Sequence, residues 1–240
     1  IKKLIKTIND NKKENTVVFS MQSSMVSILV SKFYKTRIVA RNSEDPISST
    51  FYSTNKIQAY LVFIMRFFIY NWADGIITNS KGSANSLKKF MIRNDKVCYV
   101  YNPYLTSEKI SEGKRFYNKT NTIVSVGRLT KQKNFELLIL AFYDFSQIKK
   151  NYKLIIIGRG NKKKSLIRLI HKLKLTKKVQ LKGFIKKPNK FIRSAKLFVL
   201  PSLYEGLGNV LIDAINLNTP CIATNCKSGP AEILLNGRGG

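Results

Sequence analysis

The 240-residue sequence has little histidine, cysteine or acid: one histidine, three cysteines and 13 Asp or Glu. Three cysteines, an odd number, do not make a disulfide framework, which excludes a small disulfide-stapled secreted protein. Cys221 and Cys226 have no histidine close to them in the sequence, because the single histidine, His171, lies far away. The sequence therefore predicts no metal site, and it fits a reducing cytoplasm.

Long hydrophobic runs are also lacking. Residues 57–72 form an apolar run, but it contains Gln58 and Arg66 and is shorter than the roughly 20 residues that a bilayer span needs. We expect a buried or interfacial helix there. No signal peptide is visible, and the chain begins with Ile1 and ends in Gly237-Arg238-Gly239-Gly240, which resembles a loop interior. We expect a chain truncated at both ends.

Positive charge is abundant: 43 Lys and Arg give a net charge of +30. Such a charge attracts nucleic acid, an anionic membrane face or phosphorylated ligands, although lysine-rich solvated faces explain part of it. A nucleic-acid-binding protein would need a recognition module or aromatic residues interleaved on a basic face. Neither is visible, so we predict no nucleic-acid partner.

Strands alternate with helices along the chain, which predicts parallel sheets covered on both faces. The expected strands are residues 16–19, 37–40, 75–78, 97–101, 122–126, 154–157, 179–181, 197–200 and 221–224. The expected helices are residues 23–33, 57–70, 83–91, 135–148, 162–173, 207–215 and 230–235. Between them, residues 106–121 are polar and lack apolar periodicity. We predict an α/β protein of two Rossmann-like domains, 1–105 and 122–240, with 106–121 as linker and the ligand cleft between the domains.

The expected strand 122–126 is followed by Gly127 and then by Arg128 and Lys133 before the next helix. Glycine allows a tight turn, and the two basic side chains can face a phosphate near a helix N-terminus. Basic residues before a helix are more often solvated, so this segment alone does not establish a phosphate-binding site.

A second segment carries both acids of interest. A buried strand ends near Leu200, Glu205 follows, and Gly206-Leu207-Gly208 opens a helix that contains Asp213. Helical side chains tilt toward the helix N-terminus, so Asp213 can point back toward Glu205, with the free amides of Gly206–Gly208 between them. This arrangement suits a sugar diphosphate. We expect Glu205 to be an exposed cleft acid; favourable interaction with the helix dipole is the alternative role for Asp213.

Glu205 and Asp213 have the spacing of a Glu-x7-Glu motif, with the second acid shortened to Asp. The sequence here resembles the retaining GT-B-fold glycosyltransferases of the family-four type, in the polysaccharide- and glycan-building branch. The resemblance also takes in residues 73–80, 101–103, 127–134, 181–184, 219–224 and 228–234.

The resemblance implies a role for each site residue. Arg128 and Lys133 would bind the donor diphosphate. Glu205 would bind the donor sugar together with Gly206, Leu207 and Gly208, and Asp213 would bind the ribose. The donor site would also include Gly127 and, bordering the base, Gly158, Arg159 and Phe184. Glu232 would cap the next helix, with a role in the site as the alternative. Arg41 and Glu44 belong to an Arg-x-x-Asp/Glu-Pro segment on the acceptor side, for which a turn-forming role is the even alternative.

The resemblance further implies retaining transfer of a hexosyl or N-acetylhexosaminyl group from a nucleotide sugar, a UDP-sugar, to a glycan or lipid-linked saccharide. No metal or other cofactor is implied, and the leaving phosphate would deprotonate the acceptor. The loop 20–23 replaces a first-domain histidine of many members. A GT-B-shaped nucleotide-sugar epimerase is the alternative, but it depends on histidines that this chain lacks. Net charge and the aromatic run 57–70 suggest a cytoplasmic protein peripheral on an anionic membrane surface, unless that helix packs inside the first domain.

Overall fold

The computed structural model describes residues 2–10, 16–106, 110, 118–226 and 228–239. Residues group into two compact units, Ile1–Asn102 with Lys227–Glu232, and Pro103–Cys226 with Ile233–Gly240. Most of the predicted linker lies outside the described residues, so the boundaries 1–105, 106–121 and 122–240 stay a prediction. The grouping of Lys227–Glu232 with the first unit was not foreseen from the sequence.

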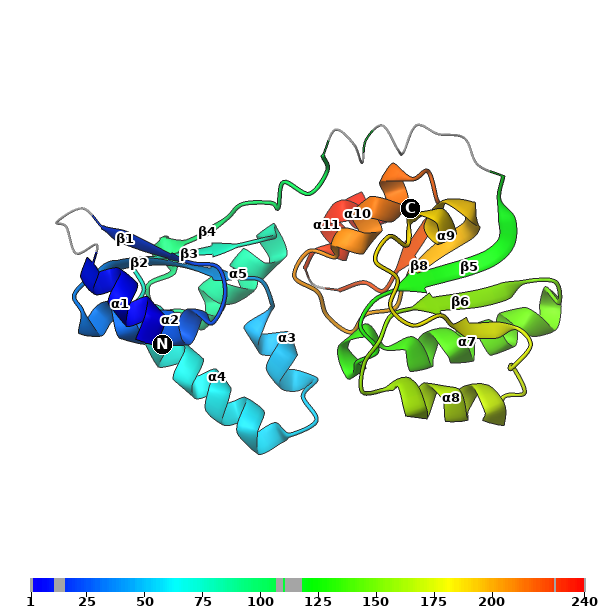
Figure 1. The fold of residues 1–240 in the computed structure, drawn as a ribbon, viewed down its shortest axis with the longest axis horizontal. Coiled ribbons are helices and arrows are strands. Elements are labelled where there is room, and N and C mark those ends of the chain that lie inside the picture. The colour runs from blue at the N-terminus through cyan, green and yellow to red at the C-terminus, as the bar shows by residue number, and fades with distance from the viewer. Residues whose placement is uncertain (1, 11–15, 107–109, 111–117, 227, 240) are drawn as a thin grey trace. The chain divides into compact units, whose positions relative to one another are not determined.

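The first unit contains a four-stranded parallel sheet in the order β1-β2-β3-β4 (Figure 1). Its strands are β1 (Val17–Ser20), β2 (Arg37–Asn42), β3 (Gly75–Thr78) and β4 (Val97–Tyr99). Its helices are α1 (Lys2–Asp10), α2 (Ser24–Phe33), α3 (Pro46–Phe51), α4 (Lys56–Asn71), α5 (Lys81–Phe90) and the 3-10 turn η1 (Asn94–Lys96).

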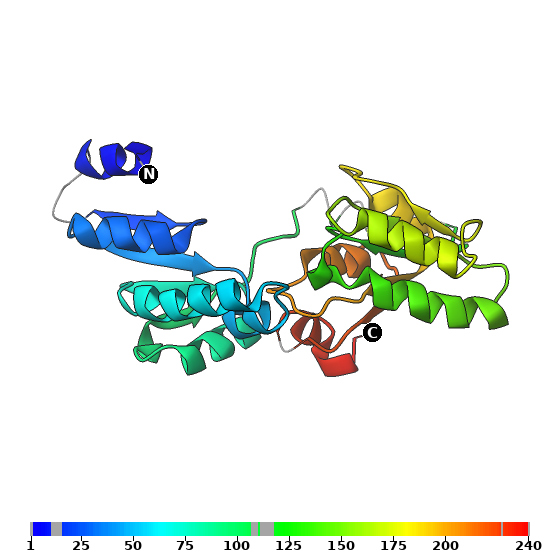
Figure 2. The ribbon, with the colours of Figure 1, turned by 90° about the horizontal axis from the view of Figure 1, so that it is seen from below.

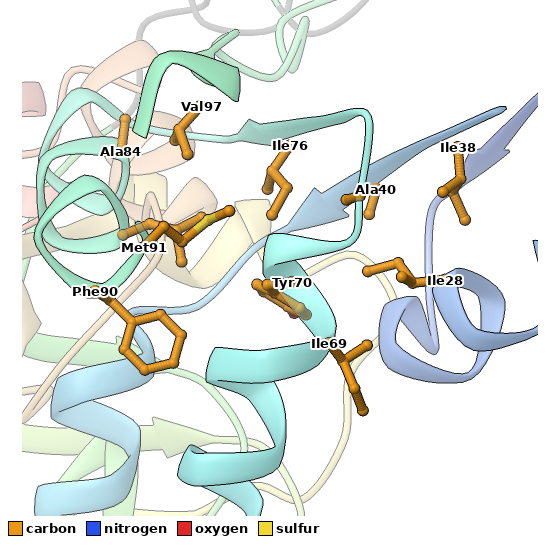
Figure 3. Close-up of a cluster of buried hydrophobic side chains, with 12 residues drawn as sticks. Ile28, Ile38, Ala40, Ile69, Tyr70, Ile76, Ala84, Phe90, Met91 and Val97 are labelled. Carbon is orange, nitrogen blue, oxygen red and sulfur yellow. The ribbon is translucent and has the colours of Figure 1, made fainter. Parts of the chain in front are cut away.

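One face of this sheet packs on helices. Figure 3 shows Ile38, Ala40 and Ile76 of the strands above side chains of α2, α4 and α5, including Ile28 and Tyr70. Ile38, Ala40 and Ile76 are almost fully buried. They lie on the same face because side chains along a strand alternate between the two faces of the sheet. On the opposite face Val17 and Phe19 are each 52% exposed. The described residues therefore cover this sheet on one face, whereas the sequence pattern predicted two.

The second unit contains a five-stranded parallel sheet in the order β7-β6-β5-β8-β9. Its strands are β5 (Thr120–Val126), β6 (Lys153–Ile157), β7 (Val179–Leu181), β8 (Ala195–Leu200) and β9 (Cys221–Ala223). Its helices are α7 (Phe135–Ile148), α8 (Lys163–Lys172), α9 (Asn189–Ser194) and α10 (Asn209–Asn216), with the 3-10 turns η2 (Lys131–Lys133) and η3 (Leu235–Gly237). The short helix α11 (Pro230–Ile233) contains residues of both units.

Both faces of the second sheet are packed. Helices α7 and α8 lie on one face and α9 and α10 on the other, as Figures 1 and 2 show. Two apolar cores result, one around Phe142 and Leu154 and the other around Phe198 and Leu211. Successive residues of β5 contribute to different cores, since Ile123 belongs to the first core and Val124 to the second. This arrangement confirms the prediction of parallel sheets covered by helices for this half.

The strand order places a reversal at the centre of the second sheet. The chain runs from β5 outward through β6 to β7, then returns to β8 on the other side of β5 and continues to β9. In open parallel sheets the crevice at such a reversal, outside the carboxyl ends of the strands, is where ligands bind. The loops that follow β5 and β8 meet at this point.

Candidate donor site

A buried ion pair joins these two loops. Lys133, the last residue of η2 after β5, donates through its ammonium group to Glu205 Oε1 in the loop after β8. The side chain of Lys133 is 12% exposed and that of Glu205 is 8% exposed. The expectation of an exposed Glu205 was therefore wrong: the whole segment from Glu205 to Gly208 is buried.

Further polar groups support the Glu205 carboxylate. Ser202 Oγ donates to the same Oε1 atom at 2.6 Å. The carbonyl oxygen of Ser202 in turn accepts from Thr224 Oγ1 and, at 3.2 Å, from Cys226 Sγ. Burial raises the pKa of the Cys226 thiol, so this thiol stays protonated and can donate. Ser202 was not singled out from the sequence, although it lies three residues before Glu205.

The loop after β5 is held against the loop after β8. Leu203 N donates to Gln132 O at 2.8 Å, and Gln132 Nε2 donates to Tyr204 O at 3.0 Å. Arg128 is exposed, and its Nη2 lies 3.4 Å from Gln132 Oε1. The two basic residues predicted to bind phosphate thus differ in exposure: Lys133 is largely buried and paired with Glu205, whereas Arg128 faces solvent.

Glycines allow the loops after β5 and β6 to approach. A Cβ at Gly158 would lie 1.8 Å from Gly127 O, and one at Gly160 would lie 2.3 Å from Leu129 O. At Gly127 a Cβ would crowd the Lys133 side chain, whose Cδ would be 3.2 Å away. Backbone hydrogen bonds close the contact, since Gly127 N donates to Ile157 O at 2.9 Å. Close backbone approach therefore requires glycine at 158 and 160.

Arg159 and Phe184 form an exposed pair at the same edge of the sheet. The guanidinium carbon of Arg159 lies 5.2 Å from the centroid of the Phe184 ring, which is 64% exposed. Gly158 N donates to Gly183 O at 2.7 Å and so ties the loop after β6 to the segment that carries Phe184. The sequence predicted these two residues at the base, and the structure brings them together.

Asp213 lies on α10, whose start differs from the prediction. The helix begins at Asn209 instead of residue 207, because Gly208 takes a left-handed conformation with φ of 89°. Asp213 is half-buried, and its Oδ2 accepts a hydrogen bond of 2.5 Å from the hydroxyl of Tyr104. No signal in the sequence pointed to Tyr104, which lies 109 residues away in a polar segment.

The residues of the first unit that the resemblance assigned to the acceptor side lie close together. Arg41, near the end of β2, and Glu44, just after it, line a cavity of about 410 Å³ with the loop after β1, including Gln22 and Ser23. Arg41 Nη2 donates to Asn102 Oδ1 at 2.8 Å, and Glu44 is exposed. The structure therefore places Arg41 and Glu44 beside the loop 20–23, a proximity that the sequence did not predict.

Glu232 caps a helix, but mainly one that is distant in sequence. Its carboxylate accepts from the backbone N–H groups of Lys81 at 2.9 Å and Gly82 at 2.6 Å, at the start of α5. It also accepts from the hydroxyl of Tyr101 at 2.9 Å, and burial together with this bond raises the pKa of Tyr101 to about 12. The bond to its own helix start, from Gly229 N, is longer at 3.4 Å. The predicted capping role is present, with α5 as the principal helix.

Within the part of the chain that the structure describes, His, Cys, Asp and Glu side chains form no group of three or more that could hold a metal ion. The helices of this part include none that is long and apolar enough to span a bilayer. The single histidine, His171, lies exposed on α8.

The two Rossmann-like sheets, and the loops that meet at the strand-order reversal, define a GT-B-type glycosyltransferase architecture. A family model described as "Glycosyl transferases group 1" matches residues 106–240, more than half of the chain. The chain belongs to this family, which confirms the resemblance to the GT-B-fold glycosyltransferases.

Curated relatives and solved structures agree with this family assignment. An uncharacterized glycosyltransferase of Methanocaldococcus jannaschii is 34% identical over 220 residues, which are 86% of this chain and 53% of the relative. The N-acetylgalactosamine-N,N'-diacetylbacillosaminyl-diphospho-undecaprenol 4-alpha-N-acetylgalactosaminyltransferase of Campylobacter jejuni is 32% identical over 219 residues, 90% of this chain and 59% of that enzyme.

The structure of Anabaena HepE in complex with UDP-glucose has the same fold, with a TM-score of 0.75 at 19% identity, over 97% of this chain and 64% of HepE. The chain thus spans a little more than half the length of the two curated relatives described above.

Proposed function

We propose that the protein to which this chain belongs transfers a sugar from a UDP-sugar to a glycan or lipid-linked saccharide, with retention at the anomeric carbon. The observation that carries the proposal is the pairing of Lys133 with Glu205 where β5 and β8 adjoin. A cation and a carboxylate at this point of a parallel sheet suit the two ends of a sugar diphosphate. The ammonium group suits the phosphates, and the carboxylate suits sugar hydroxyls.

In this proposal each side chain has one task. Lys133 and Arg128 stabilise the negative charge that grows on the departing diphosphate. Glu205 and the amides of Gly206–Gly208 hold the donor sugar, and Asp213 accepts the ribose hydroxyls. The departing phosphate takes the proton of the acceptor hydroxyl on the face that it leaves. The reaction needs no protein nucleophile and no metal ion.

The base and the transferred group are proposed on narrower grounds. Arg159 over the exposed Phe184 ring supports a planar base at this edge of the sheet. HepE was solved with UDP-glucose, and the Campylobacter relative is by name an N-acetylgalactosaminyltransferase that acts on a diphospho-undecaprenol saccharide. We therefore propose UDP as the nucleotide and a hexosyl or N-acetylhexosaminyl group as the sugar.

We also propose that the protein works at the cytoplasmic face of an anionic membrane. One face of α4 packs in the first core through Phe63 and Phe67. The other face carries apolar side chains at helical spacing that are between 40% and 79% exposed: Ile57, Tyr60, Leu61, Ile64, Met65, Phe68 and, just after the helix, Trp72. We call these seven residues the α4 stripe. An apolar, aromatic stripe on a protein with a charge of +30 supports adsorption to anionic headgroups.

The reaction is tested with full-length protein, a panel of UDP- and GDP-sugars and a lipid-linked saccharide. The expected product, found by mass spectrometry, carries one added hexose or N-acetylhexosamine from a UDP donor, and NMR shows the anomeric configuration of the donor retained. An inverted product, or transfer from GDP-sugars alone, would contradict the corresponding part of the proposal. A matched reaction with excess EDTA is expected to keep its rate.

A further inference from the structure

The Glu205 carboxylate is held at one oxygen atom by two donors. Its Oε1 atom accepts from the Lys133 ammonium group and, at 2.6 Å, from the Ser202 hydroxyl. The two donors come from different elements, since Lys133 ends η2 and Ser202 lies just after β8. An oxygen of an ionised carboxylate accepts in two directions, so these bonds occupy both directions at Oε1. Together they set the orientation of the whole carboxylate.

The backbone of Ser202 is held in turn by the loop after β9. Ser202 is only 1% exposed, and its carbonyl oxygen accepts from Thr224 Oγ1 and, at 3.2 Å, from Cys226 Sγ. Thr224 N also donates to Leu200 O at 3.0 Å, which fastens this loop to the end of β8. The residue that orients Glu205 is therefore fixed by a third loop of the same sheet.

The Ser202 hydroxyl directs the carboxylate and is not what holds the loop together. Other hydrogen bonds hold the loop after β8, since Leu203 N donates to Gln132 O at 2.8 Å and Gln132 Nε2 donates to Tyr204 O at 3.0 Å. The hydroxyl has a single proton, and this proton is directed at Glu205. Loss of the hydroxyl is therefore expected to release the carboxylate and to leave the loop in place.

Orientation matters because a carboxylate that binds sugar hydroxyls acts through directed hydrogen bonds. A hydrogen bond weakens steeply when the donor and the acceptor turn away from each other. A misplacement of about 1 Å in a catalytic site costs about 100-fold in rate. Lys133 alone is not expected to hold Glu205 so closely, because an ammonium group has three rotatable donors on a flexible stem. Ser202 has a short side chain on a fixed backbone, so its hydroxyl restricts the carboxylate more closely.

We propose that Ser202 is a positioning residue, whose hydroxyl orients the Glu205 carboxylate toward the hydroxyls of the donor sugar. Thr224 and Cys226 keep Ser202 in place. The proposal rests on the proposed function, in which Glu205 contacts the sugar and not the nucleotide. Ser202 itself, at 1% exposure, acts only through Glu205. Its loss should therefore impair transfer of the sugar without weakening the binding of UDP.

Initial rates and calorimetry on full-length protein test this role. Rates are measured with a lipid-linked saccharide and the panel of UDP-sugars, and calorimetry gives the affinity for UDP. We expect Ser202→Ala to lower kcat at least about tenfold and to change the affinity for UDP less than about twofold. A serine that only supported the fold of the site would, when replaced, lower the rate and the UDP affinity together. The matched control is Ser146→Ala, at a 1% exposed serine of α7 whose hydroxyl donates to Tyr143 O at 3.0 Å, and it should change neither.

Conservative variants separate the hydroxyl from the rest of the side chain. Ser202→Thr keeps the hydroxyl and should retain most of kcat, whereas Ser202→Cys, of similar size but a weak donor, should resemble Ser202→Ala. In the Glu205→Gln background, Ser202→Ala is expected to lower kcat less than about threefold, because the charged acceptor is gone. Thr224→Val removes the hydroxyl behind Ser202 and should lower kcat by about threefold or more with UDP affinity unchanged. This variant serves if those at Ser202 unfold.

Wild-type kcat in folded Ser202→Ala would overturn the proposal, as would wild-type kcat in folded Thr224→Val where the Ser202 variants unfold. A parallel loss of kcat and UDP affinity would overturn it as well, and so would an equal effect of Ser202→Ala with Glu and with Gln at position 205. If wild-type protein transfers sugar in these cases, the proposed function survives. If wild-type protein transfers no sugar from any UDP donor, the proposed function itself fails, and the positioning role fails with it.

Discussion

Lys133 and Glu205, 72 residues apart in the sequence, form an ion pair in which both side chains are almost completely buried. Lys133 follows β5, the central strand of the second sheet, and Glu205 follows β8, which lies next to β5 where the strand order reverses. The pair therefore occupies the point of the fold at which a ligand is expected. It also makes Glu205 a structural residue as well as a candidate site residue.

Replacement of Glu205 tests both roles. We expect Glu205→Ala to abolish transfer and, because it leaves the Lys133 ammonium buried without its partner, to lower the free energy of unfolding by about 3 kcal/mol. Glu205→Gln keeps an acceptor for Ser202 and should destabilise less while still impairing transfer. Denaturant unfolding and initial rates measure the two effects. Normal turnover in a folded Glu205→Ala variant would remove Glu205 from the donor site.

Asp213 is expected to need its charge more than its length. Asp213→Glu should be tolerated, whereas Asp213→Asn should weaken UDP-sugar binding by about 1 kcal/mol, because a charged acceptor binds hydroxyls more strongly than a neutral one. Tyr104→Phe is the companion variant, since the Tyr104 hydroxyl donates to Asp213 Oδ2. Calorimetric titration gives the affinities. Equal affinity in the Asp and Asn forms would exclude Asp213 from the ribose site.

Gly158 should not accept a side chain. Gly158→Ala places a Cβ against Gly127 O and forces the loops after β5 and β6 apart, so we expect a loss of more than about 1 kcal/mol in unfolding free energy and weaker UDP binding. Gly75→Ala is the control, since its Cβ would only touch Val39 at an ordinary 3.6 Å. Thermal unfolding compares the two. A Gly158→Ala variant as stable as Gly75→Ala would mean that the loops do not approach as described.

The α4 stripe is expected to bind anionic vesicles. Full-length protein should sediment with vesicles that contain phosphatidylglycerol, remain in solution with neutral ones and be released by high salt. Changing Ile57 and Phe68 to Glu should abolish binding. Ile148→Glu, at an equally exposed apolar residue at the end of α7, should not. Protein that stays in the supernatant with both vesicle types at low salt would favour a soluble acceptor.

Much of the fold follows from local sequence patterns. Strands such as β6, with the run Leu154–Ile157, are buried on both faces, so their apolar runs mark them without any long-range information. The short helices α3 and α9, six residues each, were missed because so few residues carry no periodicity. The one-sided packing of the first sheet was missed because its strands are almost as apolar as those of the second.

The site was predictable in its residues but not in its contacts. The motifs pointed to Lys133 and Glu205 separately, but a pair 72 residues apart depends on strand order, which a single sequence does not contain. For the same reason Tyr104 could not be assigned to Asp213, nor Glu232 to the start of α5. The burial of Glu205 was mispredicted, because an acid in a polar loop gives no sign that a lysine from another loop neutralises it.

The central claim, that the loops after β5 and β8 bind a nucleotide sugar, is tested most directly by calorimetric titration of UDP-glucose into wild type, Lys133→Gln and the control Lys163→Gln. Lys163 is exposed at the start of α8. We predict micromolar to millimolar binding to wild type and to the control, and at least about tenfold weaker binding to folded Lys133→Gln. Equal affinity in all three proteins, or no binding to wild type, would contradict the account.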